Sequence, residues 1–267
     1  MSKEMPDSVA GESQAAEHGF RLLDQAGLGV TVRDDQHDFF WLLDAARAAR
    51  RKERRFRLVD SGKLDSSSLE WLARAGADLY TADDVRADVN GLTRIQRAGL
   101  PSGAWTVFFQ YGEIGGETGG PTLERARELV QSGIDLHISN RDRPRDLALL
   151  ADIGGRRKAG RAEMVYYHHG RLAEGLEHLA EAGLWIHMTD RDLELGPDLA
   201  RLGDISRTGR RRGAGLVVHV DAGLSQTGLA DLRRAGAYLI MNIPSGFGYL
   251  GRPLSPRAFY LDTTFLL

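Results

Sequence analysis

The chain contains no cysteine among its 267 residues. Disulfide bonds, thiolate metal ligands and a cysteine nucleophile are therefore excluded. It also lacks any apolar run approaching the ~20 residues of a membrane-spanning helix. Residues 1–17 carry five charged side chains and no apolar stretch of the kind found in signal peptides. We therefore predict a cytoplasmic protein that makes no membrane contact, with residues 1–17 as a disordered tail.

An excess of charge of one sign is missing as well, because the formal net charge is only -2. No global electrostatic field therefore favours a polyanion or an anionic membrane. With 42% hydrophobic and 27% charged residues, the composition is that of an ordinary globular protein. The length fits one large α/β domain. We predict that residues 18–267 form this single domain.

A helix that ends in glycine and leads directly into a strand recurs along the chain. Such a glycine allows the left-handed backbone turn that ends a helix sharply. The glycines are Gly27, Gly76, Gly133, Gly183 and Gly236, and the strands predicted after them are 29–33, 77–83, 134–140, 184–190 and 237–243. A second kind of strand ends in a turn that contains Gly62, Gly112, Gly170 or Gly223. These turns recur about every 50–58 residues, which indicates an internal repeat.

Between the strands, apolar residues spaced by three and four, such as Leu69, Leu72 and Ala73, predict amphipathic helices. Alternating strands and helices indicate parallel strands joined by right-handed crossovers. We therefore predict an α/β fold, namely a repeat-built (β/α)8 TIM-like barrel with mostly parallel strands. Nine strands are recognisable, with a further candidate at 259–265. An open α/β solenoid or a larger barrel is the alternative.

Alternation of side chains across each strand predicts which of them face away from the helices. In the first kind of strand, Tyr80, His137 and His187 lie on that face. We aligned the strands of the second kind on their turn glycines, and this alignment predicts that a set of mostly polar and aromatic side chains lies on the same face. The set is Leu58, Asp60, Phe108, Gln110, Tyr166, His168, His219 and Asp221.

Histidine and aspartate side chains that converge at the carboxyl ends of barrel strands can hold a divalent metal ion. His137, His168, His187, His219 and Asp221 are the predicted ligands of Zn, Mn or Fe. A metal-bound water would hydrolyse a small polar or phosphorylated substrate, with His187, Asp190 and Asp221 as catalytic residues. The His-x-His pair of metal-dependent hydrolases is absent, so no family is identified. Without metal, the same groups suit acid–base chemistry, and buried core residues are the third interpretation.

Two glycine-rich segments, 112–121 and 245–248, are weaker candidates for phosphate-binding loops. Arginine clusters at 50–55, 156–161 and 210–212 are expected on the amino-terminal face, where they would bind an acidic partner or neutralise helix ends. No aromatic residue is interleaved with them, so nucleic acid is the less favoured partner. The functions left open are an enzyme, a non-catalytic repeat scaffold for a protein partner, and a binder of anionic partners.

Overall fold

The computed structural model describes residues 29–115, 121–157, 162–191, 193–220, 225–243 and 246–250. The predicted tail at 1–17, the strand at 259–265 and Asp221 lie outside these ranges. The described strands are β1 (Gly29–Arg33), β2 (Arg55–Val59), β3 (Ala77–Ala82), β4 (Thr106–Gln110), β5 (Asp135–Ser139), β6 (Met164–His168), β7 (Trp185–Thr189), β8 (Leu216–Val220), β9 (Tyr238–Ile243) and β10 (Gly246–Leu250).

Helices alternate with these strands along the chain. They are α2 (Phe39–Arg51), α3 (Ser66–Ala75), α4 (Val89–Gly99), the short 3-10 helix η1 (Leu100–Ser102), α5 (Pro121–Gln131), α6 (Leu147–Gly155), α7 (Leu176–Glu181), α8 (Leu195–Arg211) and α9 (Gln226–Ala235). None of the described helices is long and apolar enough to cross a membrane. The predicted alternation of strands and helices is therefore confirmed.

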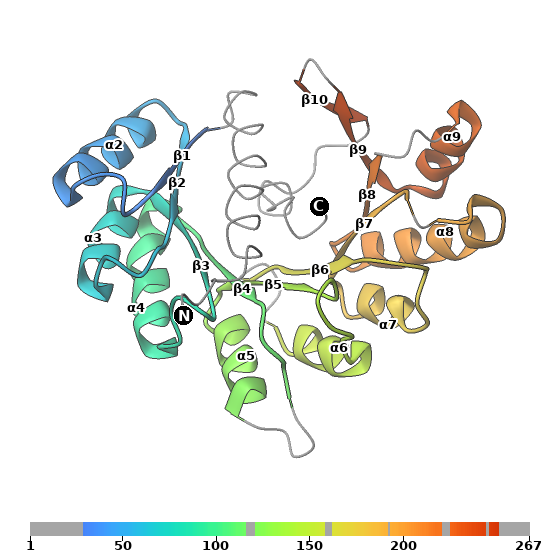
Figure 1. The fold of residues 1–267 in the computed structure, drawn as a ribbon, viewed down its shortest axis with the longest axis horizontal. Coiled ribbons are helices and arrows are strands. Elements are labelled where there is room, and N and C mark those ends of the chain that lie inside the picture. Colours follow the sequence, from blue (N-terminus) through green and yellow to red (C-terminus); the bar gives the residue numbers. More distant parts are fainter. Residues whose placement is uncertain are drawn as a thin grey trace, which may run out of the picture.

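The strands form one sheet in the linear order β1 to β10, in which β1 to β9 are parallel and β10 is antiparallel to β9. In Figure 1 the strands follow an arc and the helices lie outside it. The nine parallel strands agree with the number recognised in the sequence and exceed the eight of the predicted barrel. Among the described strands, β1 pairs only with β2 and β10 only with β9, so the described sheet does not close on itself.

Local sequence signals set the ends of the helices. Asp38, Asp65 and Asp146 each precede a helix and accept a hydrogen bond from a backbone N–H of its first turn. Gly76 and Gly236 end α3 and α9 with positive φ angles of 109° and 92°. These two glycines confirm the predicted left-handed helix ends, because a side chain is strained in that conformation.

Two buried layers lie on opposite sides of the sheet. The larger layer packs the sheet against the helices and contains Leu58, Leu79, Phe108, Leu136, Tyr166, Ile186 and Leu216. The smaller layer lies on the other side, which we call the concave face, and contains Tyr80, Val107, Phe109, Val165, Tyr167, Trp185, Val217 and Ile240. Both sides of the sheet are therefore buried, as is usual for parallel sheets.

The predicted facing of the second kind of strand is wrong for β2, β4 and β6. Leu58, Phe108 and Tyr166 pack toward the helices, whereas the prediction placed them on the opposite side. In β2, β4 and β6 the last concave-face residue, Val59, Phe109 or Tyr167, lies three residues before the turn glycine. In β8 the corresponding residue, His219, lies four residues before it. Alignment on that glycine therefore shifted these strands by one residue relative to β8, and a shift of one residue exchanges the two faces of a strand.

Residues 246–248 do not form the loop predicted for the segment 245–248. Residues 246–250 form β10, which pairs with β9 so that Gly248 lies opposite Met241. Two glycines within five residues favour a loop when only propensity is considered. The partner strand β9 supplies the hydrogen bonds that override this propensity.

Candidate functional site on the concave face

A row of six ring side chains crosses the concave face from β3 to β8. Its members are Tyr80, Phe109, His137, Tyr167, His187 and His219, and all are buried. Neighbouring ring centroids lie 6.4, 5.0, 5.8, 5.4 and 5.4 Å apart in that order. We call these residues the ring row. It brings together three of the predicted site histidines and two aromatic residues, Phe109 and Tyr167, that the sequence analysis assigned to the other face.

Two hydrogen-bonded pairs lie within the ring row. Nδ1 of His137 lies 3.0 Å from the hydroxyl of Tyr167, and Nδ1 of His187 lies 3.0 Å from Nε2 of His219. The Nε2 atoms of His137 and His187 are buried and have no hydrogen-bond partner in the described part of the chain. Such an atom is costly unless another molecule supplies its partner, because a buried polar group is normally hydrogen-bonded.

Burial keeps these imidazoles neutral. It lowers the pKa of His137 and that of His219 to about 3. Burial and the nearby His219 and His137 rings lower the pKa of His187 well below 6.5. At neutral pH each ring therefore carries one N–H donor and one acceptor nitrogen. The His187–His219 pair can present either a donor or an acceptor at Nε2 of His187, depending on which ring holds the shared proton.

His168 does not join the other histidines. It ends β6 on the same side as Tyr166, and the two ring centroids lie 6.0 Å apart. Its Nε2 lies 2.8 Å from the backbone oxygen of Arg171, so this nitrogen binds the loop that follows the strand. The one-residue shift described above explains why the alternation pattern placed His168 inward.

Asp190 occupies a position that recurs at the end of every second strand. One residue directly after each of β1, β3, β5 and β7 donates its backbone N–H to the next strand. The donors are Asp34, Asp83, Asn140 and Asp190. Each acceptor is the backbone carbonyl of the last residue in the next strand whose side chain lies on the concave face. The N···O distances are 3.1, 3.1, 3.3 and 3.1 Å, and the acceptors are Val59, Phe109, Tyr167 and His219. Asp190 thus belongs to a repeated set of four, which we call the strand-end residues.

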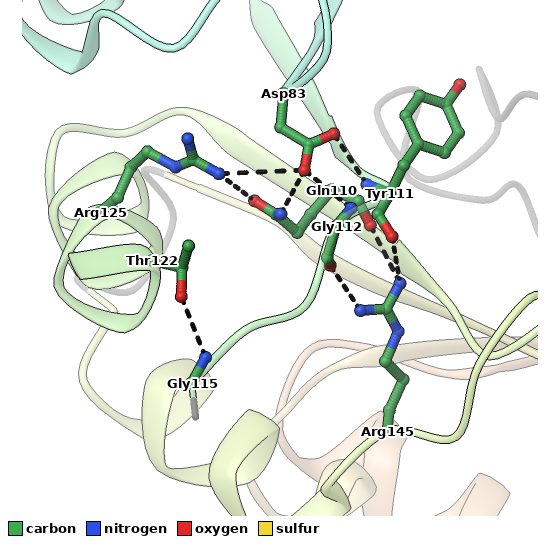
Figure 2. A network of polar contacts seen from close by, with 8 residues as sticks. All are labelled: Asp83, Gln110, Tyr111, Gly112, Gly115, Thr122, Arg125 and Arg145. Atoms are coloured by element: carbon green, nitrogen blue, oxygen red, sulfur yellow. Dashed lines mark hydrogen bonds and ion pairs between the residues drawn. The ribbon is translucent and has the colours of Figure 1, made fainter. Parts of the chain in front are cut away.

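The side chains of three strand-end residues, Asp34, Asp83 and Asn140, fasten the loop after the next strand. Asp34 accepts from the Ser61 amide at 2.9 Å. Asp83 accepts from the amides of Tyr111 and Gly112 at 3.0 and 2.8 Å (Figure 2). Asn140 accepts from the His169 amide at 2.7 Å. The loop after β8 lies outside the described residues. By equivalence, we expect Asp190 to hold that loop, and its role as a catalytic residue stays a prediction.

This expectation can be tested by substitution. Asp190→Ala is expected to lower the free energy of unfolding by about 1–3 kcal/mol, because loop amides lose their acceptor. Asp190→Asn keeps an acceptor oxygen, as Asn140 does at the equivalent position, and is expected to stay near the wild-type stability. Urea unfolding measures both variants. Equal destabilisation by the two substitutions would contradict a loop-fastening role.

Gln110 belongs to a polar network around Asp83 (Figure 2). Its amide binds Asp83 and accepts from Arg125 at 3.1 Å, which corrects its predicted inward direction. Arg145 donates to the carbonyls of Tyr111 and Gly112 at 2.9 and 2.6 Å. These contacts hold the loop after β4 in place.

The same network bears on the glycine-rich segment at 112–121. The amide of Gly112 donates to Asp83, and that of Gly115 donates to the Thr122 hydroxyl at 3.2 Å. Residues 116–120 lie outside the described ranges. The two described amides are therefore engaged within the protein, and phosphate binding by this segment stays a prediction.

The predicted metal set is placed only in part. His137, His187 and His219 lie in the ring row, His168 lies on the other side of the sheet, and Asp221 is outside the described residues. Within the described ranges, no group of three or more histidine, aspartate and glutamate side chains could hold a metal ion. Metal binding by these residues, with Asp221 as the carboxylate, therefore stays a prediction.

The arginine clusters act partly as helix-end contacts. Arg50 donates to the Arg74 carbonyl at 3.4 Å, Arg157 donates to the Gly183 carbonyl, and Arg210 lies against Gly236. Each arginine thus reaches the end of the next helix, where a positive charge complements the helix dipole. This repeated contact indicates that one arginine in each cluster neutralises a helix end, which is the second of the two roles predicted for the clusters.

The comparisons with known proteins identify no relative in sequence. No protein-family model matches the chain, and no curated protein matches it. In structure, 17 solved chains match. One is described as the PaMucR phosphodiesterase in complex with c-di-GMP, with 13% identity, a TM-score of 0.34, and coverage of 82% of this chain and 76% of that chain.

Two other structural matches bear unrelated names. One is a mandelate racemase/muconate lactonizing protein from Herpetosiphon aurantiacus, with 13% identity, a TM-score of 0.36, and coverage of 78% of this chain and 51% of that chain. The other is CpGH84B, with 11% identity, a TM-score of 0.35, and coverage of 72% and 38%. Overlaps at this level assign neither a family nor an activity to the chain.

Proposed function

We propose that the concave face binds a small, uncharged polar molecule, and that His187 and His219 serve it as an imidazole pair in acid–base chemistry. The observation that carries this proposal is the pair of buried Nε2 atoms, on His137 and His187, that lack a hydrogen-bond partner in the described chain. A buried polar group left unsatisfied costs about 1–3 kcal/mol. A hydroxyl or carbonyl group of a bound molecule would supply the partner.

The neutral state of the rings selects the kind of ligand and the kind of chemistry. A neutral imidazole N–H can donate to a carbonyl oxygen on which negative charge develops during a reaction. A proton accepted at Nε2 of His187 makes that ring an imidazolium, and the hydrogen bond from its Nδ1 to Nε2 of His219 shares the charge between the two rings. Proton transfer next to a carbonyl group is the reaction class that suits such a pair.

Metal-dependent hydrolysis is the less supported form of the enzyme hypothesis. The three histidines of the ring row are spread over β5, β7 and β8, and the described residues add no third ligand near any two of them. A metal site would need Asp221, or other residues outside the described ranges, to complete its ligands. We therefore place acid–base chemistry first.

A thermal-shift screen with uncharged carbonyl and hydroxyl compounds tests the proposal. A compound at about 100 times its Kd is expected to add about 2.7 kcal/mol to the stability of the wild-type protein. His187→Phe keeps a ring in the row and removes both nitrogens, so the added stability should disappear. The matched control is His178→Gln, which changes an exposed histidine on α7 and should leave the shift intact.

Two outcomes would count against the proposal. In one, no compound raises the Tm of the wild-type protein. In the other, the compounds that do so remain effective in both His187→Phe and His137→Phe. The first outcome would favour the second candidate function, a non-catalytic scaffold for a protein partner. The linear order of strands, which resembles that of open repeat proteins, is the observation in favour of that candidate.

A further inference from the structure

Three neighbouring helices, α2, α3 and α4, carry a concentrated positive charge on the outer layer of the fold. Two adjoining grooves of about 500 and 570 Å³ run over them and share Arg50 and Arg74. Six arginines line the two grooves: Arg47, Arg50, Arg51, Arg74, Arg94 and Arg97. Glu70 is the single acidic residue among the lining residues. This local excess of positive charge contrasts with the formal net charge of the whole chain, which is -2.

Part of this charge is compensated and part is not. Glu70 lies 3.0 Å from Arg94 and 3.6 Å from Arg74, and Asp44 lies 3.5 Å from Arg47. Arg51 and Arg97 have no ion-pair partner within the described part of the chain, and both are exposed. Guanidinium groups held on helices in this way are well suited to bind phosphate oxygens.

An exposed indole lies among these arginines. Trp71 lines the first groove and is 54% exposed, and the guanidinium of Arg74 lies 5.2 Å from its ring centroid. The sequence analysis found no aromatic residue within the arginine clusters. Trp71 is far from them in sequence, and the packing of α3 beside α2 brings it next to Arg47, Arg50 and Arg51.

The lining of the grooves favours nucleic acid over a protein partner. A protein interface needs an apolar centre that is shielded from water. Apart from Trp71, the hydrophobic lining residues are only Ala75, Ala98 and Pro101. Single-stranded nucleic acid needs what is present, namely cationic groups along a groove and an aromatic ring on which a base can stack.

We propose that the surface formed by α2, α3 and α4 binds single-stranded nucleic acid, with phosphates on the arginines and a base stacked on Trp71. This surface is formed on the helix side of the sheet, whereas the ring row lies on the concave face. The proposal is therefore independent of the proposed small-molecule site, and the two can fail separately.

Fluorescence anisotropy with labelled oligonucleotides of about 20 nucleotides, longer than the usual site sizes of ~4–16, tests this proposal. We expect oligo(U) to bind at about 50 mM salt and the affinity to fall as the salt concentration rises. The slope of log affinity against log salt concentration should become shallower by about 0.7 for each arginine–phosphate contact that is removed. Arg51→Gln combined with Arg97→Gln should lower both slope and affinity. Trp71→Leu should weaken binding by roughly fivefold or more.

A control variant removes the same charge elsewhere. Arg211→Gln combined with Arg212→Gln changes two exposed arginines at the end of α8 and should leave binding unchanged. Oligo(dT) separates RNA from DNA as the preferred strand, and a duplex of the same length tests the need for unpaired bases. Circular dichroism confirms that each variant is folded.

Several results would overturn the proposal. They are the absence of oligonucleotide binding by the wild-type protein at about 50 mM salt, equal losses in the test and control variants, and duplex binding as tight as single-strand binding and insensitive to Trp71→Leu. Binding of a polyglutamate peptide that depends on Arg51 and Arg97, without oligonucleotide binding, would replace nucleic acid by an acidic protein segment.

Discussion

Lowering the pH from 7 to 5 is expected to remove most of the stability of the folded protein. Unfolded histidines take up protons below a pKa of about 6.5. His137 and His219 resist protonation in the folded state until pH about 3, and His187 also has a strongly lowered pKa. Because the unfolded state then binds more protons, protonation favours unfolding, at about 1.4 kcal/mol per pH unit for each histidine.

For three such histidines the loss between pH 6.5 and 5 is about 5 kcal/mol. This is comparable to the whole stability of many proteins, about 5–15 kcal/mol. Asp78 acts in the opposite direction, because burial raises its pKa to about 6 and the folded state takes up that proton first. A single carboxyl group offsets only part of the effect, so the histidines determine the sign.

Urea unfolding at several pH values between 5 and 7.5 measures this dependence. His187→Phe is expected to reduce the slope of stability against pH by about one third, whatever its effect on stability at pH 7, because one of three similar groups is lost. His178→Gln, at an exposed position on α7, should leave the slope unchanged. A stability that stays constant from pH 7 to 5 would show that these imidazoles are not buried in the neutral form.

Asp60→Ala is expected to destabilise the protein more than Asp190→Ala does, by about 3–5 kcal/mol at pH 7. The carboxylate of Asp60 is fully buried and accepts from Arg86 at 2.8 and 3.0 Å, from the Thr81 hydroxyl at 2.8 Å and from the Gly62 amide at 2.9 Å. Its removal leaves the largely buried guanidinium of Arg86 without its counter-charge. Urea unfolding at pH 7 measures the effect.

Two controls separate charge burial from packing. Asp35→Ala breaks the Arg33–Asp35 pair, whose side chains are 33% and 40% exposed, and should cost no more than about 1 kcal/mol. Replacing both partners, as Asp60→Leu with Arg86→Met, should recover part of the loss, because no buried charge is left unpaired. A loss from Asp60→Ala as small as that from Asp35→Ala would contradict this account.

The order of strands and helices could be predicted because its signals are local. A glycine such as Gly76 or Gly236 marks a helix end through its own backbone conformation, and the spacing of Leu69, Leu72 and Ala73 marks a helix face. Such features depend on a few neighbouring residues. The nine parallel strands follow from them.

The composition of the ring row could be predicted only in part. His137, His187 and His219 were placed correctly, because the polar residues in their strands alternate with clearly apolar ones. Phe109 and Tyr167 were missed because both faces of β4 and β6 are apolar or aromatic, so alternation gives no contrast there. The position of Trp71 beside the arginines of α2 could not be predicted from a local pattern, since it depends on how two helices pack.

The strand-end residues have a consequence for how chains of this kind can change in length. Asp34, Asp83 and Asn140 each fasten the loop of the next strand by the same contact, so inserting or deleting a complete unit of two strands and two helices would preserve every such contact. Inserting one residue within a strand would instead exchange its two faces. Evolutionary gains and losses should therefore be tolerated in whole units, and single-residue insertions should be confined to the loops.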